Sequence, residues 1–187
     1  MKIPFIVGKN IYLRQLMEED INERYLSWLN DPEVLEFRTR RVFPSTMEDI
    51  KNLREDMRHN KNLLLGIVTR DNDLHIGNIT LGHIDWYHRK AEISILIGEK
   101  NVWGHGYGKE AIYLLSKHAF ENANMHRVYA ASPNPAFIKV VRNLGWTKEG
   151  EFREAFRHKD KYILIEYYSL LAAEFRADSE FGKRFCP

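Results

Sequence analysis

Short stretches in which apolar and polar residues alternate recur along this chain and predict a series of β-strands. β-Branched residues are common in these stretches, and polar turn residues separate most of them. The predicted strands cover residues 11–16, 63–69, 75–85, 91–98, 127–132, 146–156 and 161–171. The strands between residues 63 and 98 follow one another with only short polar connections, which is typical of an antiparallel meander.

Other segments carry apolar residues at helical spacing, and turn-forming residues mark their ends. Pro32 ends the first helix, because proline cannot continue the hydrogen-bond ladder. Ser45 and Glu48 have the spacing of a capping box before the second, and Gly145 closes the last as a left-handed cap. The predicted helices cover residues 18–29, 46–57, 107–122 and 135–144. This order of elements indicates an α/β domain with a mixed sheet.

The most specific pattern lies between residues 91 and 110, where a strand, a glycine-rich turn and a helix follow one another. After the strand ends at Ile97, the residues Gly104, Gly106 and Gly108 leave the backbone uncovered. A bare loop that leads into a helix presents unpaired N–H groups and roughly half a positive charge. The predicted ligand therefore carries a phosphate, which backbone groups hold.

Two common phosphate-binding motifs do not fit this loop. A P-loop needs a serine or threonine after Gly-Lys, whereas Glu110 follows Gly108 and Lys109. A Rossmann fingerprint has the spacing G-x-G-x-x-G at the start of a βαβ unit. The spacing from Gly104 is G-x-G-x-G, and an antiparallel meander precedes it.

Composition places the chain among ordinary soluble proteins. Its 187 residues suffice for one domain, expected over residues 1–175, with a tail over residues 176–187 that is expected to fray. The formal charge of +2 is too small to indicate a nucleic-acid partner, and no apolar run is long enough to cross a membrane. A single cysteine, Cys186, excludes an internal disulfide framework. We therefore expect a cytoplasmic protein.

Three segments together resemble the GNAT superfamily of N-acetyltransferases: AEISILIG, WGHGYGKEA and NPAFIKVVRNLGW. The resemblance implies a GNAT fold, an α/β (α+β) arrangement of a twisted, mostly antiparallel sheet with splayed central strands and helices on both faces. It also implies acetyl-CoA as cosubstrate and no metal. The coenzyme-binding residues that it implies are Ile95, Leu96, Ile97, Trp103, Gly104, His105, Gly106, Tyr107, Gly108, Lys109, Asn134, Phe137, Lys139 and Arg142.

Two further resemblances are narrower. The glycine loop, with Trp103 in its first position, resembles the branch that contains the ribosomal-protein-alanine acetyltransferases. The segments WLNDPEV and HIGNITL resemble enzymes that acetylate amino sugars. The implied acceptor is therefore either an amino-sugar nucleotide or the N-terminal amine of a protein.

In this family the amine attacks the acetyl thioester directly, so the reaction needs a base, an oxyanion donor and an acid. Glu92 matches the glutamate that serves several members as base; its alternative role is a structural ion pair. The family's oxyanion donor is a backbone N–H on the same strand, here near Leu96 and Ile97. A free carboxylate titrates near pH 4.3, so a base role needs burial or a water relay.

The acid is where the chain departs from the family. Its usual tyrosine position falls on Val141, which cannot donate a proton. Ser132, Ser94 and Tyr129 are the candidate replacements, and their alternative role is ordinary strand packing. The missing tyrosine also leaves open a protein that binds acetyl-CoA without transferring the acetyl group.

Several charged residues could line the acceptor side. The run Arg38, Arg40 and Arg41 is either a solvated surface or a basic rim of the cleft. His83, Asp85 and His88 precede the core strand, but their spacing is not that of a metal site. The oligomeric state does not follow from these patterns.

Overall fold

The computed structural model describes residues 3–38, 43–59 and 62–175. The predicted tail over residues 176–187 lies outside the described residues, as do Arg40 and Arg41. None of the described helices has the length and hydrophobicity needed to cross a membrane.

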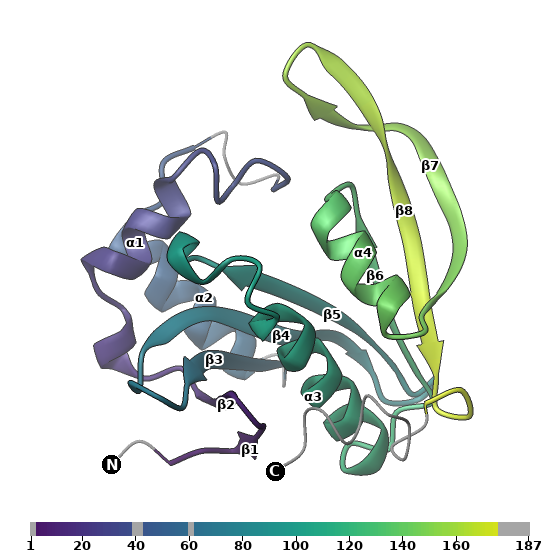
Figure 1. The fold of residues 1–187 in the computed structure, drawn as a ribbon, viewed down its shortest axis with the longest axis horizontal. Coiled ribbons are helices and arrows are strands. Elements are labelled where there is room, and N and C mark those ends of the chain that lie inside the picture. Colours follow the sequence, from purple (N-terminus) through teal and green to yellow (C-terminus); the bar gives the residue numbers. More distant parts are fainter. Residues whose placement is uncertain (1–2, 39–42, 60–61, 176–187) are drawn as a thin grey trace.

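One twisted sheet runs through the described part of the molecule (Figure 1). Its spatial order is β1-β2-β3-β4-β5-β6-β8-β7. Neighbouring strands are antiparallel everywhere except between β5 and β6, which are parallel. The strands are β1 (Ile6–Val7), β2 (Ile11–Gln15), β3 (Leu63–Thr69), β4 (His75–Asp85), β5 (Lys90–Ile97), β6 (Arg127–Ser132), β7 (Thr147–His158) and β8 (Lys161–Leu171).

Helices cover both faces of this sheet. Alternation along β5 shows how the faces are divided, because Ile93 joins the large core cluster under α3 and α4, whereas Leu96 joins a smaller cluster under α1 and α2. Both faces are therefore apolar at the centre of the sheet. The helices are α1 (Glu23–Asn30), α2 (Met47–His59), α3 (Tyr107–Glu121) and α4 (Pro135–Asn143), with short 3₁₀ turns at Glu18–Asp20 and Lys100–Val102.

The two central strands separate after a short paired segment. β5 pairs with β6 only where Lys90, Ala91 and Glu92 lie opposite residues 127–129. From Ile93 to Ile97, β5 is paired with β4 alone, so its other edge faces a gap between the strands. We call this gap the split. The predicted splayed central strands, and with them the predicted fold class, are confirmed.

Two helix starts differ from the prediction. The first predicted helix is interrupted after Asp20, and α1 begins only at Glu23, where Asn22 Oδ1 accepts a hydrogen bond from Tyr25 N at 3.1 Å. The capping pair of α2 lies one residue later than predicted. Thr46 and Asp49 form it, with Asp49 N donating to Thr46 Oγ1 at 3.2 Å. In both places the side chain that reaches the first free N–H groups sets the boundary.

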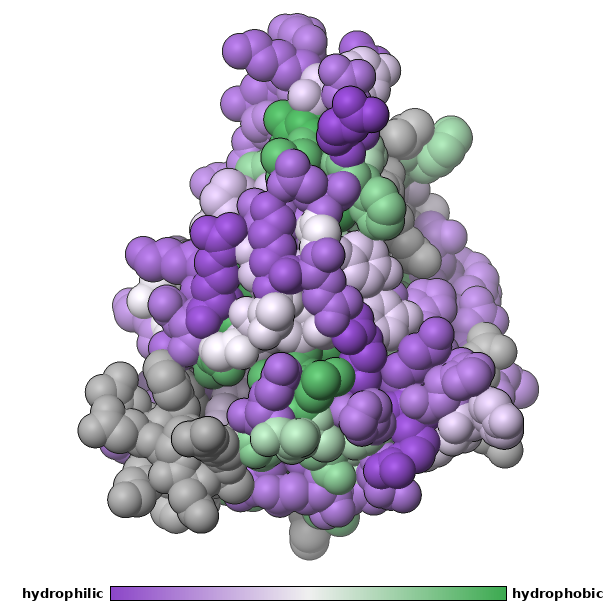
Figure 2. Space-filling model, turned by 90° about the vertical axis from the view of Figure 1, so that its right-hand side faces the viewer, coloured by the Kyte–Doolittle hydropathy of each residue, from purple (hydrophilic) through white to green (hydrophobic). Residues whose placement is uncertain are grey.

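β7 and β8 form a long hairpin that extends beyond the rest of the sheet (Figure 1). β7 is an edge strand, and its side chains are exposed except near Phe156. Figure 2 shows that this side of the molecule is mainly hydrophilic, with small hydrophobic areas. Charged side chains on an edge strand discourage pairing with another chain. At the hairpin's tip, His158 Nε2 lies 3.0 Å from Glu36 Oε1, in the segment between α1 and α2.

Candidate active site

The glycine-rich loop and the start of α3 form a backbone cradle at the wide end of the split. Gly104 and Gly106 have φ angles of 83° and 86°, a conformation in which a side chain is strained. Gly106 is the N-cap of α3 and supplies no side chain to the first helical N–H groups. Trp103 Nε1 donates to Ile97 O at 3.0 Å, which ties the loop to the end of β5. The first turn of α3 is thus built to receive an anion.

Backbone groups along β5 point alternately to β4 and into the split. Gly98 N donates to Ile76 O of β4 at 3.0 Å. Because the direction alternates, the backbone groups of Leu96 also point toward β4. Ile95 and Ile97 then face the split, and their carbonyl oxygens accept hydrogen bonds from Arg38 Nη2 (2.6 Å) and from Trp103. Of the two residues expected to carry the oxyanion donor, only Ile97 turns its backbone toward the split.

Arg38 reaches the split from the segment that follows α1. Its guanidinium donates to Ile95 O, on the edge of β5 that has no strand partner. The neighbouring Phe37 stacks on His158 of the hairpin tip, with ring centroids 5.1 Å apart. The segment between α1 and α2 therefore contacts both β5 and the β7–β8 hairpin.

Glu92 lies at the closed end of the split, where the two strands still pair. Its Cα partner in the parallel register is Tyr129 of β6. Glu92 Oε2 lies 3.6 Å from His83 Nε2, and the Glu92 side chain is 30% exposed. In the alternative role of Glu92, a structural ion pair, the described partner is the imidazole of His83. A carboxylate in this place can accept a proton from a group that arrives from solvent.

A β-bulge sets the position of His83. The register of β4 against β5 shifts between Gly82 and Asp85, and His83 has a φ of 47°. Bulges often redirect a side chain beside an active site, and a left-handed non-glycine residue is uncommon. The sequence predicts for His83 only a position on the acceptor side. A one-residue shift within a long strand leaves no pattern in the sequence that would reveal it.

Aromatic rings continue the surface around Glu92. Tyr129 stacks on Tyr167 of β8, with centroids 6.0 Å apart and planes at 12°, and Phe152 of β7 meets Tyr167 edge-on. Burial raises the pKa of Tyr129 above its ordinary value of 10, and the nearby charge of Glu92 raises it further. The phenol of Tyr129 therefore keeps its proton at neutral pH.

The other candidate acids lie in different surroundings. Ser94 is exposed on β5, on the same face as Glu92. Ser132 lies on the opposite face of β6 from Tyr129, since alternation places it with Val128 and Ala130 of the core. Val141 is completely buried in that core.

Residues at the start of α4 bond locally. Ser132 Oγ accepts from Asn134 N at 3.1 Å. Asn134 Oδ1 accepts from Ala136 N at 2.9 Å and so caps α4, while Phe137 packs against the core. To contact the coenzyme as well, the Asn134 side chain would have to do so alongside its hydrogen bond with Ala136 N.

The two cations predicted on α4 line a groove beside the hairpin. This groove, of about 430 Å³, lies between α4 and β8. Arg142 Nη2 donates to Glu166 Oε2 at 2.9 Å, and its Nε to Tyr168 Oη. Lys139 is exposed at the same groove. Arg142 is thus held by the hairpin, whereas Lys139 extends into solvent.

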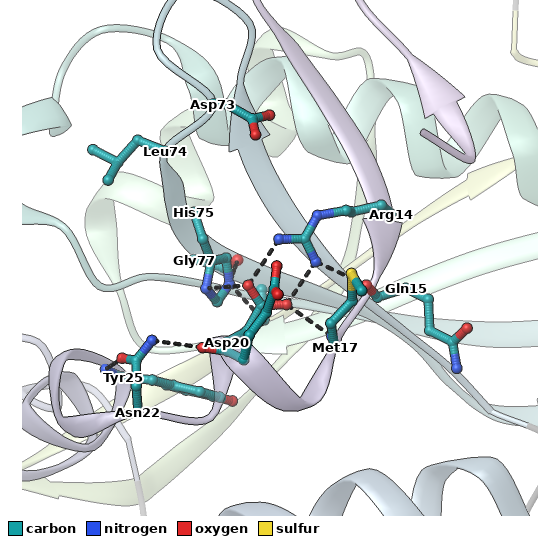
Figure 3. A network of polar contacts seen from close by, with 12 residues as sticks. Arg14, Gln15, Met17, Asp20, Asn22, Tyr25, Asp73, Leu74, His75 and Gly77 are labelled. Atoms are coloured by element: carbon teal, nitrogen blue, oxygen red, sulfur yellow. Dashed lines mark hydrogen bonds and ion pairs between the residues drawn. The ribbon is translucent and has the colours of Figure 1, made fainter. Parts of the chain in front are cut away.

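A buried polar network joins the segment before α1 to the sheet, and it contains His75 and Gly77 of HIGNITL (Figure 3). Arg14 donates to both carboxylate oxygens of Asp20, at 2.6 and 2.7 Å. His75 Nε2 lies 2.9 Å from Gly77 O, and its ring packs edge-on against Trp28 at 5.3 Å. These residues are buried and contact one another. A role in stabilising the fold therefore explains the segments HIGNITL and WLNDPEV without a role in binding an amino sugar.

Comparison with known proteins identifies the family. The family model described as "Acetyltransferase (GNAT) domain" matches residues 10–147, so this chain belongs to the GNAT acetyltransferases. Among curated relatives, the uncharacterized N-acetyltransferase p20 of Bacillus licheniformis is 28% identical over 89% of this chain and 96% of its own. Spermidine N(1)-acetyltransferase of Vibrio cholerae is 27% identical over 56% of this chain and 61% of its own.

A solved structure of similar fold is that of the Vibrio cholerae spermidine N-acetyltransferase in complex with CoA and spermine. It has a TM-score of 0.78 and 21% identity, over 88% of this chain and 97% of that one. The expectation of an N-acetyltransferase that uses acetyl-CoA is confirmed at the level of the family.

Proposed function

We propose that this chain transfers an acetyl group from acetyl-CoA to a primary amine by direct attack, with Glu92 as the base. The observation that carries the proposal is the split itself. It opens beside the glycine-rich start of α3 and closes at the rung formed by Glu92 and Tyr129. One end suits the coenzyme pyrophosphate, and the other offers a carboxylate to the amine.

The residues divide between binding and proton transfer. Gly104 to Lys109 hold the pyrophosphate through the backbone, and the split-facing N–H groups of Ile95 and Ile97 bind the pantetheine arm. An alkylammonium titrates near pH 10.4, so the amine has to lose a proton before it attacks. Glu92 accepts that proton directly or through a water, and His83 orients the carboxylate.

Among the possible acceptors we rank an amino-sugar nucleotide first. Arg38 supplies a cation at the split, and the partly exposed aromatic rings beside Glu92 offer flat faces to a sugar ring. A protein N-terminus is second, and its support is the resemblance of the glycine loop to the ribosomal-protein-alanine branch. We place the reaction in the cytoplasm, in keeping with the single cysteine.

The test is an acceptor panel with acetyl-CoA, in which the release of free thiol is measured. The panel contains an amino-sugar nucleotide, the same sugar without the nucleotide, spermidine and a peptide with a free N-terminal alanine. Turnover of any amine supports the transferase, and the preferred amine decides the acceptor class. Binding of CoA without turnover of any of them would overturn the proposal in favour of a coenzyme-binding protein that transfers nothing.

A further inference from the structure

The departing coenzyme A thiolate needs a proton, and α4 does not provide one. Val141 is completely buried within the core, with no polar atom in its side chain. Ser132 faces α4 and already accepts from Asn134 N. The acid therefore has to come from another element that borders the split.

Tyr129 borders the closed end of the split. It is the last residue of β6 that pairs with β5, directly opposite Glu92. From Ile97 back to Glu92, β5 spans about 17 Å, at about 3.3 Å per residue. A pantetheine arm that starts at the cradle and extends along this edge carries its thioester to that rung.

We propose that Tyr129 is the catalytic acid of this enzyme and that it replaces the family's helix tyrosine from β6. This inference rests on the proposed transferase function. The stack on Tyr167 fixes the plane of the Tyr129 ring, and the paired rung fixes its distance from Glu92. Base and acid would thus stand side by side at the thioester, on neighbouring strands.

The step balances without another reactant. The amine nitrogen forms a bond to the acetyl carbon, and its proton goes to Glu92. The carbon–sulfur bond then breaks, and its electron pair stays on sulfur. The Tyr129 hydroxyl gives its proton to that sulfur, and the resulting phenolate regains a proton from water after the base has released its own.

Charged and titratable groups from four strands surround the phenol. Glu92 of β5, Asp85 of β4 and Tyr167 of β8 raise its pKa, whereas Arg127 of β6 lowers it, and burial makes the largest contribution. The net pKa lies above the ordinary value of 10. Loss of the proton would therefore affect the rate only in strongly alkaline solution.

The experiment compares Tyr129→Phe with Tyr162→Phe, a matched loss of a hydroxyl from an exposed tyrosine of β8. In the preferred acceptor assay, Tyr129→Phe should lower kcat roughly 10²-fold while CoA binds with unchanged affinity. Tyr162→Phe should leave both quantities unchanged. If Tyr129→Phe keeps the wild-type kcat, the inference is wrong, although wild-type turnover would still support the proposed function.

A second variant keeps the hydroxyl and the stack. A fluorinated tyrosine at position 129 has a lower phenol pKa and should move the alkaline limb of the kcat profile to lower pH by the same amount. An alkaline limb that stays in place would overturn the assignment, even if Tyr129→Phe were to fold poorly. A wild-type enzyme without turnover would instead contradict the proposed function.

Discussion

Two clusters in this molecule set a histidine beside a carboxylate, and water reaches them very differently. In the network under α1, His75 and Asp20 are 4% and 5% exposed, and Arg14 is buried with them. At the split, the side chains of His83 and Glu92 are 79% and 30% exposed. Similar residue types thus occur in two environments of opposite character.

The bonds in the two clusters differ as much as their exposure. Asp20 receives two hydrogen bonds from Arg14 and one from Met17 N, so its lone pairs are largely used. Burial alone would raise the pKa of Asp20, but these bonds and the charges of His75 and Arg14 lower it overall. Within the described part of the chain, Glu92 has one charged contact, at 3.6 Å to His83. A buried cluster with several hydrogen bonds stabilises the fold, whereas an open one can exchange protons with a substrate.

The largest effect is expected at Asp20. Asp20→Asn leaves the buried guanidinium of Arg14 without its counter-charge, so the free energy of unfolding should fall by roughly 3–5 kcal/mol. Urea unfolding measures this change in the free energy of unfolding. The control is Glu151→Gln, which removes an exposed pair with Lys148 and should cost less than about 1 kcal/mol. A similar cost for both variants would remove the distinction between the clusters.

Glu92→Gln should instead lower the activity and leave the stability nearly unchanged. We expect kcat/KM to fall roughly 10²-fold, or about 2.7 kcal/mol of transition-state stabilisation. The free energy of unfolding should change by less than about 0.5 kcal/mol, because the side chain is partly exposed and lightly bonded. Steady-state kinetics and urea unfolding on the same preparation separate the two. An unchanged kcat/KM would show that Glu92 is not the base.

A fall in pH should lower the free energy of unfolding through His75 of the buried cluster. Burial lowers the pKa of His75, so the unfolded chain binds the proton first as the pH falls below the ordinary value near 6.5. Stability is therefore full above that value and declines toward the folded-state pKa, by at most about 1.4 kcal/mol per pH unit for one proton. His75→Gln should reduce this slope between pH 7 and pH 5 and leave the part that comes from His118, whose pKa burial also lowers. A slope that is unchanged in the variant would show that His75 does not contribute to it.

The smallest effect is expected at His83. An exposed pair contributes little to stability, so His83→Gln should change the free energy of unfolding by less than about 0.5 kcal/mol. Its kcat/KM should fall by less than that of Glu92→Gln, because His83 orients the base and does not itself take the proton. Measuring both variants across the same pH range provides the comparison. A loss as large as that of Glu92→Gln would make His83 the base.

Much of the fold follows from local patterns. The strand at residues 91–98 and the helix at residues 107–122 appear as β5 and α3 within one residue at each end. Gly145 ends α4 with a φ of 81°, as its place after the helix predicts. The short strand β1 and the break after Asp20 were missed. β1 has only two residues, too few for an alternation to appear, and the break after Asp20 accompanies a buried ion pair with Arg14, which periodicity does not reveal.

The sequence by itself determined the elements, the glycine-rich anion cradle and the family, because turn chemistry, periodicity and motif spacing are local properties. It also showed that Val141 occupies the position of the family's usual tyrosine. Only the tertiary structure decided which strands separate, where Tyr129 meets Glu92, and which of two histidine–carboxylate pairs is buried. The physical reason is that register, burial and hydrogen-bond saturation arise between segments that lie far apart along the chain.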